Sequence, residues 1–249
     1  MQVIAFISGK GGVGKTTLVS NIGAALAQRK KRVLLIDLDP QNALRLHLGM
    51  APDEIAGLAR EGISSAGVFD SPFGVQFIPF GQISNAELDE FEQDLAERPD
   101  WLSNSLASLS RHAFDFILLD TPPGASVFLQ QALIAAHRAI VVVMPDAASL
   151  VTVPKILSLI ENHTAGRATF AGASLLINQM PDQNALGHQV RSALYAQYPT
   201  HVAPVSIHKD ARVAQSLAFE RPLLEYEPGA KASLDLHYVA DWLLDSTDR

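Results

Sequence analysis

The residues best suited to chemistry lie near the start of the chain, in the segment Ser8–Thr17. This segment reads S-G-K-G-G-V-G-K-T-T and contains the phosphate-loop pattern G-x-x-x-x-G-K-[ST] from Gly9 to Thr16. An apolar run, Val3–Ile7, precedes it, and a helical pattern, Leu18–Leu26, follows it. Because the motif needs a strand before it and a helix after it, this context favours a nucleotide-binding site over a glycine-rich turn without a ligand.

The phosphate loop offers backbone and side-chain groups to a triphosphate. Glycines with positive φ angles turn backbone N–H groups inward as an anion nest, and the helix that begins near Lys15 adds its N-terminal dipole. We expect the Lys15 ammonium to reach the β- and γ-phosphates and the Thr16 hydroxyl to hold Mg²⁺. The backbone groups expected around the phosphates belong to Gly9, Gly11, Gly12, Val13 and Gly14, with positive φ at all four glycines.

Two further apolar runs end in aspartates. Val33–Ile36 is followed by Asp37-Leu38-Asp39, and Phe114–Leu119 is followed by Asp120-Thr-Pro-Pro-Gly124. Ligands of open α/β sheets bind beyond the carboxyl ends of the strands. A lone aspartate there often only caps the next helix, but beside a phosphate loop it is typical of the Walker B position, which supports Mg²⁺. We therefore expect Asp120 to serve the metal and Gly124 to bring a backbone N–H close to the γ-phosphate.

A later apolar run, Ala173–Ile177, is followed by Asn178-Gln179. If that run is another strand of the same sheet, the Asn178 amide lies at the same ligand-binding edge. An amide in this place pairs with a nucleobase or simply forms a turn, and its position in the sequence does not separate the two alternatives.

Apolar runs alternate with helical patterns along the whole chain. The expected strands are Val3–Ile7, Val33–Ile36, Val75–Pro79, Phe114–Leu119, Ala139–Met144, Ala173–Ile177 and His201–Val205. Repeated strand–helix units predict an α/β fold with a doubly wound, mostly parallel sheet and helices on both faces, as in P-loop NTPases. The segment Ala51–Ser71 is predicted to be mostly loop with a short helix. Since no linker or repeat interrupts the pattern, we expect residues 1–249 to form a single domain.

Composition narrows the class of protein. The chain has 249 residues, a formal net charge of −7 and no cysteine, which excludes disulfides and cysteine-ligated metals. The negative charge argues against nonspecific DNA binding, so we expect no nucleic-acid partner. We see no signal peptide and no apolar run of membrane-spanning length. The acidic closing segment Asp241–Arg249 lacks the basic face of a membrane-binding helix. We therefore expect a cytoplasmic protein.

One residue inside the loop narrows the family. Lys10 gives the loop a second lysine, K-G-G-V-G-K-T, and this form resembles the deviant Walker A loop of the ParA/MinD family of dimeric ATPases. Further stretches resemble that family in the same order along the chain. They are L-L-I-D-L-D-P-Q ending at Gln41, F-I-L-L-D-T-P-P-G ending at Gly124 and L-I-N-Q ending at Gln179.

The resemblance implies a role for each matching residue and a common mechanism. By it, Lys10 crosses to the phosphates of a partner subunit, Asp39 positions the attacking water, and Asp37 belongs to the Mg²⁺ network. It also assigns Thr17 to the α-phosphate and Asn178 to the adenine base. The cofactors implied are ATP and Mg²⁺, the ATP-bound state is a homodimer, and hydrolysis is slow.

Within this family the sequence is similar to a branch that serves bacterial cellulose biosynthesis. The stretches that carry this likeness are I-P-F-G-Q-I-S (Ile78–Ser84), S-I-H-K-D (Ser206–Asp210) and V-A-D-W-L-L (Val239–Leu244). It implies protein partners in the cellulose synthase complex, which would bring the ATPase to the inner-membrane face or a cell pole. The alternative is a ParA-type DNA-partitioning ATPase that binds nucleoid DNA nonspecifically, and a MinD-like membrane-docking protein ranks below both.

Overall fold

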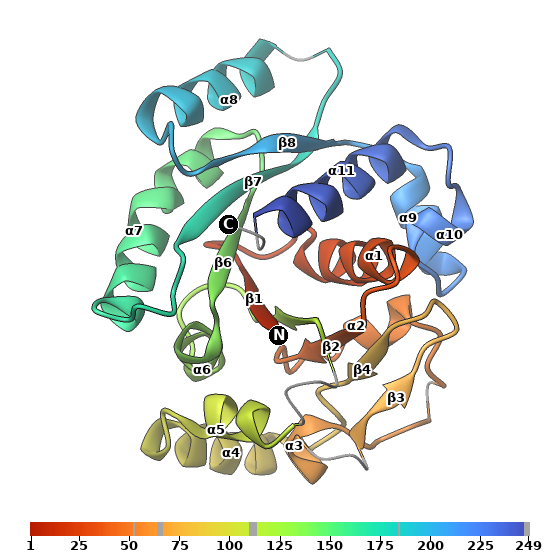
Figure 1. The fold of residues 1–249 in the computed structure, drawn as a ribbon, viewed down its shortest axis with the longest axis vertical. Coiled ribbons are helices and arrows are strands. Elements are labelled where there is room, and N and C mark those ends of the chain that lie inside the picture. Colours follow the sequence, from red (N-terminus) through yellow and green to blue (C-terminus); the bar gives the residue numbers. More distant parts are fainter. Residues whose placement is uncertain (52, 64–66, 110–113, 184, 247–249) are drawn as a thin grey trace.

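Within the described residues, one mixed sheet of eight strands forms the centre of the molecule (Figure 1). The computed structural model describes residues 1–51, 53–63, 67–109, 114–183 and 185–246. In chain order the strands are β1 (Gln2–Ile7), β2 (Val33–Asp37), β3 (Phe69–Asp70), β4 (Gln76–Ile78), β5 (Phe116–Asp120), β6 (Arg138–Val143), β7 (Ala173–Met180) and β8 (Val202–His208). They lie side by side in the order β3-β4-β2-β5-β1-β6-β7-β8, and every pairing is parallel except that of β3 with β4.

Helices cover both faces of the sheet, which confirms the predicted doubly wound α/β fold. One face packs against α3 (Leu58–Glu61), α4 (Asn85–Glu97), α5 (Trp101–Ser108), α6 (Val127–Ala135), α7 (Ala147–Thr164) and α8 (Ala185–Gln197). The other packs against α1 (Lys15–Gln28), α2 (Leu44–His47), α9 (Arg212–Ala218), α10 (Leu223–Tyr226) and α11 (Lys231–Asp245). On this second face α1 and α11 lie side by side (Figure 1).

The central strand β1 shows why its sequence is apolar throughout. Successive side chains of a strand point to opposite faces, so a strand covered on both sides has no polar face. Val3, Ala5 and Ile7 pack on the α6 side, whereas Ile4 and Phe6 pack on the α1 side. Since β1 lies between β5 and β6 near the middle of the sheet, the loop that follows it opens at the centre of the carboxyl edge.

The structure differs from the sequence-based expectation in three places, one of which is β8, expected at His201–Val205 but extending to His208. The segment expected to be mostly loop with a short helix contains that helix, α3, but also β3, which pairs antiparallel with β4 through Phe69 and Phe77. In addition, β7 does not end before Asn178 but continues to Met180, past an irregularity at Gln179, whose φ is 58°. Two residues are too few to produce a periodic signal, and a backbone irregularity inside a strand leaves no pattern of hydrophobicity.

Among the described residues, no helix is long and apolar enough to span a membrane. The closing segment Asp241–Arg249 is helical through Asp245, and its residues 247–249 lie outside the described part of the chain.

Candidate functional site

The phosphate loop connects β1 to α1 at the carboxyl edge of the sheet. Gly14 is the residue before α1 and adopts φ 92° and ψ 26°, and Gly12 has φ 74°. These are left-handed conformations that favour glycine. Positive φ was expected at Gly9 and Gly11 as well, and there the expectation was wrong, because neither adopts it.

Gly9 is required because a side chain there would clash with its neighbours, and not because of its backbone angle. A Cβ atom at Gly9 would lie 2.7 Å from the Cβ of Thr152 and 3.3 Å from Ile156, both on α7. Gly14 is required for both reasons: its φ is positive, and a Cβ there would lie 2.6 Å from the Nδ2 of Asn178. The phosphate loop is therefore packed tightly between α7 on one side and β7 on the other.

Lys15 is the first residue of α1 and is buried, with 7% of its surface exposed. Its Nζ donates a hydrogen bond to Ser8 Oγ at 3.0 Å. Burial lowers the pKa of Lys15, while the nearby charges of Asp120 and Asp39 raise it. An ammonium group has three donors, and burying it with so few partners is costly. The side chain is thus prepared for an anion at the helix N-terminus, such as a phosphate.

Two aspartates face each other across neighbouring strands. Asp37 ends β2, Asp120 ends β5, and the two are register partners in the parallel pair. Burial and the charge of Asp120 raise the pKa of Asp37 well above its ordinary value. Burial also raises the pKa of Asp120, to about 7, although Thr16 and Lys15 counteract this. Two buried carboxylates this close repel each other unless a proton or a cation is shared between them.

The oxygens of these aspartates differ in their availability. The carboxylate of Asp37 accepts hydrogen bonds from the backbone N–H groups of Asp39 and Leu44, each at 3.0 Å. Neither oxygen of Asp120 receives a hydrogen bond of ordinary geometry from the described residues, although the Thr16 hydroxyl is near enough to lower its pKa. A buried carboxylate beside a hydroxyl suits a hard divalent cation such as Mg²⁺. The residues present therefore fit a metal at Asp120 and Thr16, whereas Asp37 shapes the loop that follows β2.

Asp39 and Gly124 belong to the loops after β2 and β5. Asp39 is half-buried, and one carboxylate oxygen, Oδ1, accepts from the backbone N–H of Gln41 at 3.0 Å. Its charge acts on both Lys15 and Asp120, which places it at the same site. The backbone N–H of Gly124 donates to Ser8 O at 2.9 Å. The φ of Gly124 is 76°, a left-handed conformation, and its contact with a γ-phosphate stays a prediction.

The second lysine of the loop has an intramolecular partner. The Nζ of Lys10 lies 2.6 Å from Oδ2 of Asp146, and both side chains are about one-third exposed. Asp146 also caps α7, since its Oδ1 accepts from the backbone N–H of Ser149 at 2.7 Å. Sequence reasoning missed Asp146, although it follows an apolar strand as Asp37 and Asp120 do.

A cavity of about 390 Å³ continues from the phosphate loop along α1. Its lining is largely apolar and includes Gly14, Thr17 and Asn178 as well as residues 208–211, which begin at the last residue of β8. The Nδ2 of Asn178 donates to Val13 O at 2.7 Å, so this amide group is tied to the phosphate loop. Size, apolar walls and a few polar groups are typical of a pocket that holds a small organic ligand.

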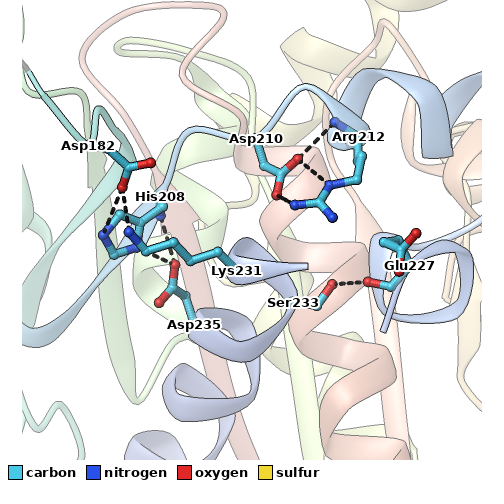
Figure 2. Close-up of polar contacts among 8 residues, drawn as sticks. All are labelled: Asp182, His208, Asp210, Arg212, Glu227, Lys231, Ser233 and Asp235. Atoms are coloured by element: carbon cyan, nitrogen blue, oxygen red, sulfur yellow. Dashed lines mark hydrogen bonds and ion pairs between the residues drawn. The ribbon is translucent and has the colours of Figure 1, made fainter. Parts of the chain in front are cut away.

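Hydrogen bonds and ion pairs hold the far wall of this cavity in place (Figure 2). The imidazole Nδ1 of His208 lies 2.7 Å from Oδ2 of Asp235 on α11, and the same oxygen accepts from the backbone N–H of His208 at 2.9 Å. Lys231 forms an ion pair with Asp182. The His208–Asp235 contacts attach the end of β8 to α11, and Lys231 attaches α11 to the loop after β7. The Arg212–Asp210 pair at 2.8 Å joins two residues within the segment after β8.

Comparison with known proteins agrees with this geometry. The family model described as "Cellulose biosynthesis protein BcsQ" matches residues 1–244. The chain is 30% identical over 228 residues to the chromosome-partitioning ATPase Soj of Thermus thermophilus, covering 90% of this chain and 88% of that protein. It is 27% identical over 252 residues to the cellulose biosynthesis protein BcsQ of Salmonella typhimurium, covering 98% and 94%, respectively.

A solved structure extends the comparison to bound ligands. Cobyrinic acid a,c-diamide synthase of Mycobacterium smegmatis, with bound ATP analogue and magnesium, matches with a TM-score of 0.81 and 26% identity. The match covers 98% of this chain and 94% of that one. Because the family model matches residues 1–244, the similarity to this family extends beyond the short motifs to nearly the whole chain. The chain belongs to the BcsQ family, within the ParA/MinD group of P-loop ATPases.

Proposed function

We propose that this protein is a Mg²⁺-dependent ATPase that forms a homodimer around ATP and supports the assembly, placement or regulation of the bacterial cellulose synthase complex. One observation carries the ATPase assignment: the Lys15 ammonium is buried close to the Asp120 carboxylate at the start of a helix. A phosphate-binding cation and a metal-binding oxygen in one place suit a triphosphate with its magnesium ion.

The residues around the site take distinct roles in this proposal. Lys15, Thr17 and the backbone of Gly11–Gly14 bind the phosphates, while Thr16 and Asp120 hold the metal. When bound, the magnesium ion supplies positive charge to the phosphate oxygens. Asp39, whose Oδ2 has no hydrogen bond within the described part of the chain, orients the attacking water. Two further residues act without touching the phosphates or the metal. Asp37 fixes the loop that carries Asp39, and Asn178 positions the phosphate loop beside the base.

Lys10 supports the proposal of a dimer. In one subunit Lys15 already occupies the phosphate-facing position, whereas Lys10 lies at the surface, 2.6 Å from Asp146. Two ammonium groups repel each other unless an anion lies between them, so a second lysine in the same loop is best used on the triphosphate of a facing subunit. ATP would then be part of the interface between the subunits.

The cellulose part of the proposal is supported by the BcsQ family match over residues 1–244 and by the 27% identity to the Salmonella protein. On this reading the protein is cytoplasmic and reaches the inner-membrane face or a cell pole through components of the cellulose synthase complex. The function is then exerted by the ATP-dependent dimer on those partners.

A second function is favoured by a specific observation. The chain is 30% identical to the partitioning ATPase Soj, which raises the alternative of a DNA-partitioning ATPase that binds nucleoid DNA. The formal net charge of −7 weighs against it, because nonspecific DNA binding depends on lysine and arginine contacts to phosphates.

One experiment separates the two functions. The tagged protein and its Lys15→Ala variant are purified with ATP and Mg²⁺ from cells that express the cellulose synthase components, and also titrated with a nonspecific DNA duplex. We expect the wild-type protein to retain cellulose synthase components, the variant to lose them, and neither to bind the duplex at physiological salt. DNA binding that requires ATP and weakens steeply with salt would support partitioning and contradict the cellulose assignment.

A further inference from the structure

A second cavity, of about 490 Å³, lies at the amino edge of the sheet. It is therefore at the end of β1 opposite to the phosphate loop. Its apolar walls come from β1, α5 and α6 and include Val3, Leu106 and Ile134. Its polar side includes His137, directly before β6, and Arg167, between α7 and β7. No acidic side chain is among the described residues that line it.

Arg167 places a positive charge in this cavity without a carboxylate to balance it. Its Nη1 donates to Leu133 O at 2.6 Å and its Nη2 to Ala136 O at 2.9 Å, so it caps the last turn of α6. These bonds use two of the five N–H donors of a guanidinium. Within the described ranges no carboxylate forms an ion pair with Arg167. Arg167 is half-buried, and this burial lowers its pKa.

His137 adds a neutral donor on the same side. The backbone N–H of Val3 donates to His137 Nδ1 at 3.0 Å, and this bond needs a lone pair on Nδ1. The ring is therefore neutral with its proton on Nε2, a state that agrees with the direction of its pKa, which burial and Arg167 both lower. Nε2 is then a hydrogen-bond donor, so it can bind an acceptor atom of a ligand.

We propose that this cavity binds a small monocarboxylate with an apolar tail, with its carboxylate at Arg167 and His137 and its tail between α5 and α6. A guanidinium and an N–H donor match the two oxygens of a carboxylate, and a half-buried cation with no carboxylate partner among the described residues favours an anionic ligand. The volume equals that of about sixteen water molecules at ~30 Å³ each, which is room for a chain of several carbons. The apolar lining favours such a tail over a free phosphate or nucleotide.

Octanoate is the probe that tests this site, with acetate and octylamine as controls for the head group and the tail. Binding to the full chain is followed by calorimetry and by ¹H–¹⁵N spectra, in which the Val3 amide reports on the cavity. We expect saturable binding of octanoate with a Kd in the ~millimolar range, as suits a ligand of this size. Acetate and octylamine should bind at least about tenfold more weakly, since each lacks one half of the match.

Three variants locate the site. Arg167→Gln keeps an amide donor for the cap of α6 but removes the charge, and it should weaken octanoate binding about tenfold or more. Ala107→Trp, on the exposed side of α5, should fill the cavity and abolish binding without touching the cap. Arg191→Gln removes the same charge from the exposed face of α8 and should change nothing.

The inference is overturned by octylamine binding as tightly as octanoate, or by octanoate binding that Ala107→Trp leaves intact. It is equally overturned if octanoate shows no saturable binding up to its solubility limit. Because Ala107→Trp does not depend on Arg167, the test holds even if Arg167→Gln fails to fold. ATP affinity should remain unchanged in all three variants, so a failure here is distinct from a failure of the ATPase proposal.

Discussion

The ammonium of Lys10 and the carboxylate of Asp146 lie 2.6 Å apart within one subunit. Asp146 uses its other oxygen to cap α7, so the ion pair connects the phosphate loop to the start of that helix. If Lys10 acts on the triphosphate of a partner subunit, it must leave or share this contact. The pair thus sets a small free-energy cost on dimerisation in the absence of ATP.

The first prediction concerns this pair. Asp146→Asn keeps a side chain that caps helices well but removes the negative charge. Exposed ion pairs are worth ~0.2–1 kcal/mol, so the dimerisation equilibrium constant at limiting ATP should rise by a factor of about 1.4 to 5 for each pair removed. Light scattering coupled to size exclusion measures it, with Asp94→Asn, from the exposed Arg98–Asp94 pair, as the control. A smaller dimer fraction would mean that Asp146 instead stabilises the interface.

Lys10→Ala should behave in the opposite way. We expect it to bind ATP nearly as well as the wild-type protein but to remain monomeric when ATP and Mg²⁺ are added. The reason is that its ammonium is needed on the facing subunit, while Lys15 serves its own. A dimer that forms with ADP and tolerates Lys10→Ala would place the interface elsewhere.

Lys15→Ala should weaken nucleotide binding strongly. A charge-assisted hydrogen bond in a buried site is worth roughly 1.5–3 kcal/mol, so affinity should fall by about tenfold to more than a hundredfold. Calorimetry with ATP and Mg²⁺ measures the change. Lys155→Ala, on an exposed position of α7, is the matched control and should bind normally. Wild-type affinity in Lys15→Ala would refute the assignment of the phosphate site.

Asp39→Ala should separate binding from hydrolysis. Orienting the water acts on the transition state more than on bound ATP, so affinity should persist while single-turnover hydrolysis is lost. The variant should accumulate as an ATP-bound dimer. Unchanged hydrolysis would point to Asp37 as the relevant carboxylate.

His47 should make the stability of the protein depend on pH. It is buried on α2, and burial lowers its pKa from 6.5 to about 4. Above pH 6.5 it is neutral in both the folded and the unfolded state. Between pH 6.5 and 4 only the unfolded state takes up the proton, so the free energy of unfolding falls as pH falls, by up to about 1.4 kcal/mol per pH unit.

Denaturant unfolding at pH 7, 5.5 and 4.5 measures this slope. His47→Gln should reduce it, whereas His188→Gln, at an exposed position of α8, should leave it unchanged. Equal slopes in the wild-type protein and His47→Gln would show that the buried imidazole takes up its proton in the folded state as readily as in the unfolded one.

Much of the site was predictable because parallel strands end at one edge. The phosphate loop that carries Lys15 follows an apolar run, and so do Asp37 and Asp120, so once these runs are parallel strands their ends must meet. The alternation of apolar runs and helical patterns likewise predicted the sheet and its two helical layers. These features are local in the sequence, so they leave a local signal.

The parts that could not be predicted depend on contacts between distant segments. Gly9 is a glycine because α7 passes 2.7 Å from where its Cβ would lie, and nothing near Gly9 in the sequence records that helix. The same holds for the pairing of Lys10 with Asp146 and of His208 with Asp235. The sequence shows that Asp146 and Asp235 are present, but only the folded chain determines which residue each of them pairs with.

The phosphate loop is held by one contact from each of three neighbouring strand ends. Gly124, after β5, donates to Ser8 O; Asp146, after β6, pairs with Lys10; and Asn178, on β7, donates to Val13 O. A shift of the loop when a ligand enters would have to break these contacts or carry all three segments with it. If the contacts persist, such a shift would move Gly124, Asp146 and Asn178 together, so that three strand ends would respond to one ligand as a unit.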